Sequence, residues 1–411
     1  MWRDSRLQLL LAIGSLTVMA GAVLAPNLPE LIHQLHFEPG IAGTLVSLHF
    51  LTVAISLPLL GILADSVGAL PVLVPSLILY AGFGMAGAAM DSLVPLMITR
   101  VLLGVATGGL TAASLGLVGK LYRADARSQV LAYVASTISL ANIVYPLLGG
   151  WVGSFHWQWA FYLYGVGLPL AALSLLLLRD GAADQGIAGA ASQPGSEIMG
   201  ELLPDVAIAP LRSNLFLLLR HPHTVGLLLA LGLTSGTVYT SIVYVPLYLR
   251  TALGTSTLVI GIILASKALG ATVISAVGVR PLVKAWGNLG AIALGYGVMA
   301  AALITIPHLQ QISLILPTAL LFGMGFGIVV PSLYGLLADQ APLQLQSSIL
   351  AAGTGAGFLG QFLFPILFAP VFGQVGITGV FYTAAIVALG AGSLIIVRLS
   401  QQRANPLHSK R

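Results

Sequence analysis

Cysteine is absent from this chain of 411 residues, and charged side chains make up only 7% of it. Without cysteine the protein can have no disulfide framework, no thiolate metal site and no cysteine nucleophile. Soluble domains carry roughly 25% charged residues, whereas 57% of this chain is hydrophobic. A soluble protein of this size could not bury so much apolar surface, so we expect a lipid bilayer to be its solvent.

Motifs of catalysis and of ATP binding are missing as well. The sequence contains no Gly-x-Ser-x-Gly elbow, no His-Glu-x-x-His pair and no Gly-x-x-x-x-Gly-Lys phosphate loop. Its 12 Asp and Glu residues fall in expected loops or at the ends of apolar runs. We therefore predict no enzyme activity, no cofactor and no metal site, and we do not expect ATP to drive the protein directly.

What the chain does contain is an ungapped internal repeat. The stretch 100–148 reappears as 319–367, 219 residues later. Matched pairs include Gly104 and Gly323, Gly108 and Gly327, Gly116 and Gly335, Ser128 and Ser347, Ala132 and Ala351, Asn142 and Gln361, and Pro146 and Pro365. A duplicated bundle of membrane helices is how many secondary transporters are built.

Twelve apolar runs are long enough to cross a bilayer, which takes roughly 20 residues. They are 7–25, 41–63, 71–90, 93–119, 128–152, 158–178, 224–249, 258–279, 288–306, 312–338, 346–371 and 377–397. The sequence thus predicts an all-α membrane protein of twelve transmembrane helices, arranged as two pseudo-symmetric six-helix bundles. We expect an N-terminal bundle (1–178), a cytoplasmic linker with a short surface helix near 211–220 (179–223), a C-terminal bundle (224–397) and a cytoplasmic tail (398–411).

The basic residues indicate the orientation. With the N-terminus inside, fourteen of the 17 Lys and Arg residues fall on the inner side, Arg250 falls on the outer side, and Arg100 and Lys267 fall within spans. This positive-inside bias predicts that both termini are cytoplasmic. The formal net charge of +5 therefore reflects topology rather than nucleic-acid binding. We expect residues 1–25 to be an uncleaved first helix rather than a signal peptide.

Three motifs stand in the first half of the chain. They are Gly61-Ile-Leu-Ala-Asp65-Ser-Val-Gly68, Arg100-x3-Gly104-x3-Gly108, and Ala141-x3-Tyr145-Pro146-x2-Gly149-Gly150. At these residues the chain resembles the major facilitator superfamily, in particular its twelve-helix drug:proton antiporter branch. The resemblance implies a monomeric secondary transporter of a small molecule, coupled to protons, in a plasma membrane such as the bacterial inner membrane.

The resemblance also assigns conformational roles. Asp65, between Gly61 and Gly68, corresponds to a residue that latches the two halves at a helix N-terminus, where the helix dipole favours a carboxylate. The family usually has basic residues where this chain has Ser66 and Ala69, and the alternative for Asp65 is an ordinary solvated loop acid.

The fifth-span motif is the antiporter signature of the family. Ala141 and Tyr145 replace its usual first two glycines, while Pro146, Gly149 and Gly150 remain. Proline removes a backbone hydrogen bond and glycine permits close helix approach, so we expect a bend at the interface between the halves. The alternative is a proline-kinked span with a glycine-rich end.

Three ionisable side chains fall inside spans, where charge is costly and therefore marks candidate functional sites. Arg100 corresponds to a family residue that faces the central cavity, and the alternative is that it snorkels to the outer interface. His49 and Lys267 lie 218 residues apart, at nearly equivalent positions of the repeat. We expect both to point into the cavity, with a core histidine bonded to a backbone carbonyl as the alternative for His49.

These cations, and the lack of mid-span carboxylates, predict a neutral or anionic, largely apolar substrate. Asn142, Gln361, Tyr239, Tyr244 and Tyr334 are further candidates for the cavity lining. His49 is the best-placed coupling group, ahead of Glu30 and Asp65. Proton-coupled export is the leading hypothesis. Uptake of a small organic solute and a transport-inactive membrane sensor are the alternatives.

Overall fold

In a computed structural model, the structure describes residues 4–122, 124–178, 218–342 and 345–404. Within these ranges every regular element is helical. The first group of helices comprises α1 (Ser5–Ala22), η1 (Ala25–Asn27), α2 (Leu28–Leu35), α3 (Pro39–Val67), α4 (Ala69–Ala86), η2 (Gly87–Ala89), α5 (Leu93–Leu121), α6 (Ala124–Gly153), α7 (Trp159–Tyr162) and η3 (Leu163–Val166), after which 167–178 are helical.

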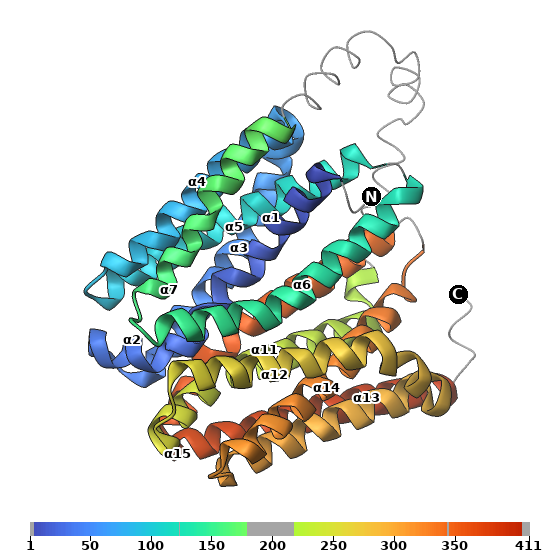
Figure 1. The fold of residues 1–411 in the computed structure, drawn as a ribbon. Coiled ribbons are helices and arrows are strands. Elements are labelled where there is room, and N and C mark those ends of the chain that lie inside the picture. Colours follow the sequence, from blue (N-terminus) through green and yellow to red (C-terminus); the bar gives the residue numbers. More distant parts are fainter. Residues whose placement is uncertain (1–3, 123, 179–217, 343–344, 405–411) are drawn as a thin grey trace.

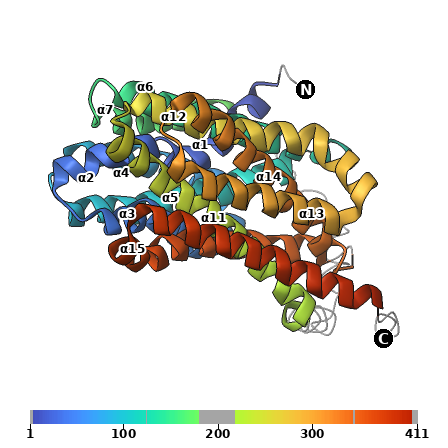
Figure 2. The same ribbon diagram turned by 90° about the horizontal axis from the view of Figure 1, so that it is seen from below.

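The second group comprises α11 (Pro222–Leu253), α12 (Thr257–Val273), the π-helical turn η4 (Ile274–Gly278), α13 (Val279–Thr305), η5 (Ile306–His308), α14 (Ile312–Ala338) and α15 (Gln346–Ala404). Figure 1 shows the blue-to-green helices as one bundle and the yellow-to-red helices as the other, with α6 and α12 where they meet. Figure 2 gives the same arrangement from below.

The described residues contain ten apolar helical stretches of membrane-spanning length, and two of these are double. The stretches Thr257–His308 and Ser348–Val397 have 52 and 50 residues. Helices of that length would extend roughly 75 Å, whereas the hydrocarbon core of a bilayer is about 30 Å thick. Each is broken by a glycine with non-helical backbone, Gly287 and Gly376, both at φ 70°. The fold therefore has the twelve predicted crossings, and the two-bundle fold class is confirmed.

Local sequence explains most helix boundaries. Gly254 adopts the left-handed conformation (φ 61°) that ends α11, and the Ser256 hydroxyl accepts from the Val259 amide to begin α12. Gly68, at φ 97°, separates α3 from α4 without further loop residues.

The expectation of a turn at Pro26, Asn27 and Pro29 is wrong, because η1 and α2 occupy this segment. Both prolines lie in a first helical turn, where a missing amide hydrogen costs nothing. The helix α15 also continues beyond the expected end of the last span at 397, to Ala404. Most of the predicted linker, 179–217, and with it most of the predicted surface helix, lies outside the described residues; residues 218–220 are helical.

The repeat is visible in how the helices pack. The Cα of Gly104 on α5 faces the His49 carbonyl on α3, and the Cα of Gly323 on α14 faces the Lys267 carbonyl on α12. Glycine lets the helix backbones come this close. His49 and Lys267 therefore occupy equivalent places in the two halves, as their sequence spacing predicts.

Candidate functional site

The two bundles meet along two helix pairs that the repeat relates to each other. On α3, a Cβ added to Gly43 would lie 2.5 Å from the Pro365 Cβ of α15. On α12, a Cβ added to Gly261 would lie 2.5 Å from the Pro146 carbonyl oxygen of α6. No larger side chain fits at either glycine without movement of the facing helix. The interface therefore depends on the same glycine–proline contact used twice, with the halves exchanged.

The predicted gating residues of the fifth-span motif lie at this interface. Gly150 accepts a hydrogen bond from the Thr257 hydroxyl of α12 at 3.2 Å. Gly149 packs on the backbone of Val23, and its carbonyl accepts from the Asn27 amide at 2.9 Å. The motif thus contacts both the first helix of its own half and the facing half. Its gating role remains a prediction.

Three further interactions join the halves. The Tyr239 hydroxyl on α11 donates to the Val46 carbonyl at 3.0 Å, and the Ser47 hydroxyl donates to the Phe362 carbonyl at 3.3 Å. Arg250, near the end of α11, pairs with Glu30 of α2 at 3.4 Å. The ion pair, Gly43 and the Thr257 bond all lie at the end of the bundle where α3 and α12 begin. We call this the closed end. Farther along the same or neighbouring helices, Asp65, Asn142 and Thr354 are exposed.

His49 is buried beside this interface, with 1% of its surface exposed. Its Nδ1 lies 2.7 Å from the Val46 carbonyl oxygen, the same oxygen that accepts from Tyr239. Because a carbonyl cannot donate, Nδ1 carries the hydrogen. Nε2 is buried without a partner and faces Gly21. In this conformation His49 therefore takes the carbonyl-bonded placement, the alternative to a cavity-facing one.

Lys267 is partly buried inside the C-terminal bundle. From α12 its ammonium lies 3.3 Å from the Ser241 hydroxyl of α11 and 6.0 Å from the centre of the Phe322 ring of α14. Among the buried polar side chains of the described residues there is no Asp or Glu. The ammonium is therefore held by a hydroxyl and a ring face rather than by a carboxylate.

Arg100 takes neither of its two expected placements. It is 1% exposed within the N-terminal bundle, so it neither faces an open cavity here nor reaches the outer interface. Its guanidinium carbon lies 5.2 Å from the centre of the Phe161 ring and 5.4 Å from that of Tyr164, and one nitrogen is 3.4 Å from the Tyr164 hydroxyl. Aromatic faces stabilise this buried cation.

The remaining predicted residues are accessible to differing extents. Asn142 is exposed and donates to the Ile138 carbonyl of its own helix, while Gln361 is half-buried on α15. The half-buried Tyr334 has its hydroxyl 3.3 Å from that of Thr354. Asp65 is exposed at the end of α3, and in the described part of the chain its carboxylate has no hydrogen bond or ion pair.

Two parts of the interface were not recognised in the sequence. Gly43 and Gly261 served there as markers of the repeat, although pairing a repeated glycine with the repeated Pro365 and Pro146 would have suggested their contact. The bulky Tyr145, which departs from the family motif, has its hydroxyl 2.7 Å from Ser15 of α1. The tyrosine thus adds a hydrogen bond within the N-terminal half.

The comparisons with known proteins agree with this architecture. The model of the Major Facilitator Superfamily matches residues 10–365. The chain is 23% identical over 406 residues to the class B tetracycline resistance protein of Escherichia coli, covering 94% of this chain and 95% of that protein. It is 34% identical over 128 residues to the multidrug export protein EmrB of Escherichia coli K12, covering 31% of this chain and 25% of that protein.

Similarity extends to solved structures and has a stated reach. A bacterial homologue of the human lysosomal transporter Spinster, in an inward-facing and unoccupied conformation, matches with a TM-score of 0.74 and 12% identity, over 97% of this chain and 96% of that one. The chain matches 25% to 30% of the length of the first three curated relatives. Because the family model covers most of the chain and the twelve-helix fold accords with it, this multi-pass membrane protein belongs to the major facilitator superfamily of transporters.

Proposed function

We propose that the chain exports a small amphipathic compound, neutral or anionic, in exchange for protons. The two bundles would rock about their interface in an alternating-access cycle. The observation that carries this proposal is the closed end, where two repeat-related glycine–proline contacts and the Glu30–Arg250 pair join the halves. Interactions concentrated at one end form a closure that can separate while each bundle stays intact.

Orientation places this closure in the membrane. The positive-inside bias predicts cytoplasmic termini, so that α3 would begin on the outer side and the closed end would face outward. The structure would then correspond to the inward-facing state of the cycle. We propose a plasma membrane location, with the chain working as a monomer.

Export is supported by the relatives and by the fifth-span motif. The match to the class B tetracycline resistance protein runs through nearly the whole of both chains. The motif that resembles the antiporter signature packs directly on α12 through Gly150. A bend or slide at this contact would change how the halves meet, which is where a motif controlling direction would need to act.

The substrate class is inferred from charge. Lys267 offers an ammonium whose nearest partner is the neutral Ser241 hydroxyl. A substrate that accepts hydrogen bonds or carries negative charge would supply what the protein itself does not place there. An organic cation would find no buried carboxylate among the described side chains. We therefore favour a neutral or anionic amphiphile.

His49 is the proposed proton-coupling group. Imidazole changes charge near neutral pH, and its Nε2 has no partner in this conformation. Its Nδ1 shares the Val46 carbonyl with Tyr239 of the other half. Separation of the halves would remove Tyr239 from that carbonyl and alter the surroundings of His49. Occupancy of Nε2 by a proton could in this way depend on the conformational state.

The decisive experiment is flux in proteoliposomes with an imposed pH gradient of either sign. Matched aromatic probes with a carboxylate, an amide or a quaternary ammonium head would be compared. We expect the carboxylate and amide probes to move against their gradients when protons move the other way, and Lys267→Gln to reduce the carboxylate flux most. Preference for the ammonium probe would overturn the substrate class. Uptake driven by protons moving with the probe would instead establish the permease alternative, and no flux of any probe would favour the sensor.

A further inference from the structure

A pocket of about 570 Å³ opens at the closed end, separate from His49 and Lys267. Five of its lining residues come from the N-terminal bundle and six from the C-terminal bundle: Pro29, Glu30, Ile32, His33 and Pro39, and Leu247, Arg250, Thr251, Phe372, Gly376 and Ile377. Its volume lies within the range of sites for drug-sized molecules, roughly 300–1,000 Å³.

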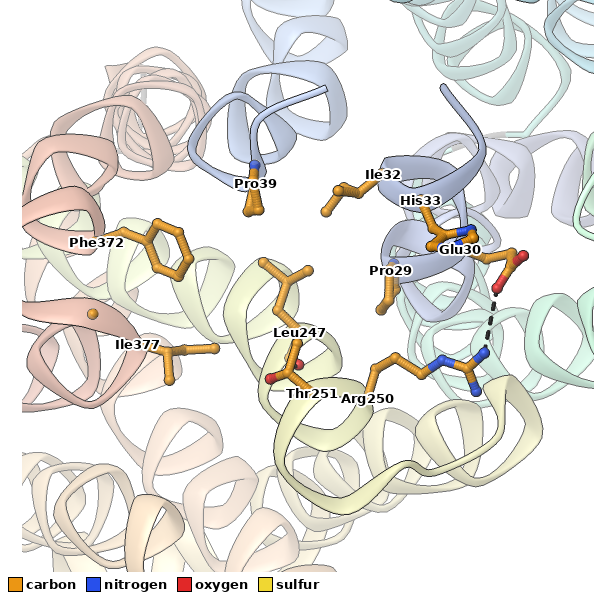
Figure 3. Close-up of a pocket in the computed structure, with 11 residues that line it drawn as sticks. Pro29, Glu30, Ile32, His33, Pro39, Leu247, Arg250, Thr251, Phe372 and Ile377 are labelled. Atoms are coloured by element: carbon orange, nitrogen blue, oxygen red, sulfur yellow. Dashed lines mark hydrogen bonds and ion pairs between the residues drawn. The ribbon is translucent and has the colours of Figure 1, made fainter. Parts of the chain in front are cut away.

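The walls are apolar and the charges stand together on one side. Figure 3 shows Phe372 and Ile377 facing Pro29 and Ile32 across the pocket, with Leu247 between them. Arg250 extends along the rim to its ion pair with Glu30. A ligand that fills this pocket needs an apolar body and one polar head.

The rim favours a negatively charged head. Both oxygens of Glu30 are engaged, one by Arg250 and the other by the Gln34 amide at 2.8 Å. Arg250 uses one nitrogen for Glu30 and another for the Thr255 carbonyl at 3.2 Å, and its side chain remains 45% exposed. A guanidinium has five N–H donors, so donors remain for a ligand. The exposed His33 on the same rim adds a second group that can donate.

We propose that this pocket binds a small amphipathic carboxylate from the solution at the closed end and thereby holds that end shut. The two walls belong to different bundles, so the site is complete only while the bundles are together there. A ligand that binds one conformational state shifts the population toward it. Such a compound would inhibit transport without occupying the central site. This inference rests on the alternating-access part of the proposed function.

The binding experiment uses 1-naphthoate as the probe, and 1-naphthylmethylammonium as its cationic counterpart, on purified full-length protein by titration calorimetry. We expect naphthoate to bind the unaltered protein. Arg250→Gln and Phe372→Ala should each weaken binding about tenfold or more, by loss of a charge-assisted hydrogen bond or of the apolar wall. Arg280→Gln, an exposed arginine outside the pocket, should leave it unchanged.

Lys267→Gln separates this pocket from the proposed central site. Naphthoate binding that survives Lys267→Gln and is lost in Arg250→Gln supports the pocket. The reverse pattern would overturn it while leaving the proposed function standing. Tighter binding of the ammonium probe would likewise overturn it.

The conformational consequence is measured with spin labels at Ser154→Cys and Gln310→Cys, two exposed positions in different bundles. Because the chain has no cysteine of its own, labelling needs no background substitutions. Naphthoate should increase the short-distance population in the labelled protein, and fail to do so when Arg250→Gln is added. An unchanged or longer distance with naphthoate bound would contradict the claim that the ligand holds this end shut.

Discussion

Gly43 on α3 and Pro365 on α15 are in contact at the closed end, where a Cβ on the glycine would lie 2.5 Å from the proline Cβ and 3.3 Å from its Cα. The same relationship joins Gly261 on α12 to Pro146 on α6. Closure between the halves therefore rests on two small residues, each facing a proline that is itself part of the internal repeat.

Substitution of either glycine by leucine should prevent closure. A leucine at position 43 or 261 would overlap backbone atoms of the facing helix, which cannot move as a flexible side chain can. We expect longer Ser154–Gln310 spin-label distances and transport reduced to background. The matched control is Gly297→Leu, since a Cβ there has no atom within 4 Å. Normal transport by Gly43→Leu would show that the contact is not needed for the cycle.

Crosslinking across the outer ion pair should arrest transport. With Glu30→Cys and Arg250→Cys in a chain that has no other cysteine, a bifunctional thiol reagent can join only α2 to α11. We expect crosslinked protein to retain its fold and lose flux, with recovery after cleavage of a reducible linker. Each single-cysteine variant is the control. Full flux in crosslinked protein would mean that this end does not open.

Replacement of His49 by glutamine should separate coupling from movement. The glutamine amide can still donate to the Val46 carbonyl but cannot take up a proton. We expect downhill flux of the probe to persist, while accumulation driven by a pH gradient disappears. Tyr239→Phe serves as the comparison, because it removes the other bond to that carbonyl, worth about 0.5–1.5 kcal/mol, and leaves the imidazole in place. Gradient-driven accumulation by His49→Gln would remove His49 from the coupling mechanism.

Arg100 should tolerate an apolar residue of similar length better than a small one. Its guanidinium lies on two aromatic rings, and Nε and one terminal nitrogen have no partner. Replacing a buried charge by a well-packed apolar side chain is often neutral, whereas Arg100→Ala would leave a cavity and cost about 2–4 kcal/mol. Thermal unfolding in detergent should rank Arg100→Met well above Arg100→Ala. The opposite order would indicate that the charge itself stabilises the bundle.

Composition and periodicity predicted the twelve crossings well, because each apolar run must span the bilayer and few other solutions exist. The repeat also predicted that His49 and Lys267 are equivalent. The surroundings of Arg100 could not be predicted in the same way. They depend on Phe161 and Tyr164, about 60 residues away, and on the rotation of α5 within its bundle, which no local pattern specifies. The Glu30–Arg250 pair escaped notice for a similar reason, since its partners lie in different halves.

The exchange of Gly43–Pro365 for Gly261–Pro146 has a further consequence. Each half carries one glycine and one proline of the closure, so the contact has the form of an isologous dimer interface, in which one surface patch meets its own copy. A single ancestral half could have formed this closure by pairing with a second protomer. Fusion of the two copies then freed Arg100, His49 and Lys267 to differ, because the interface that holds the halves together did not require them.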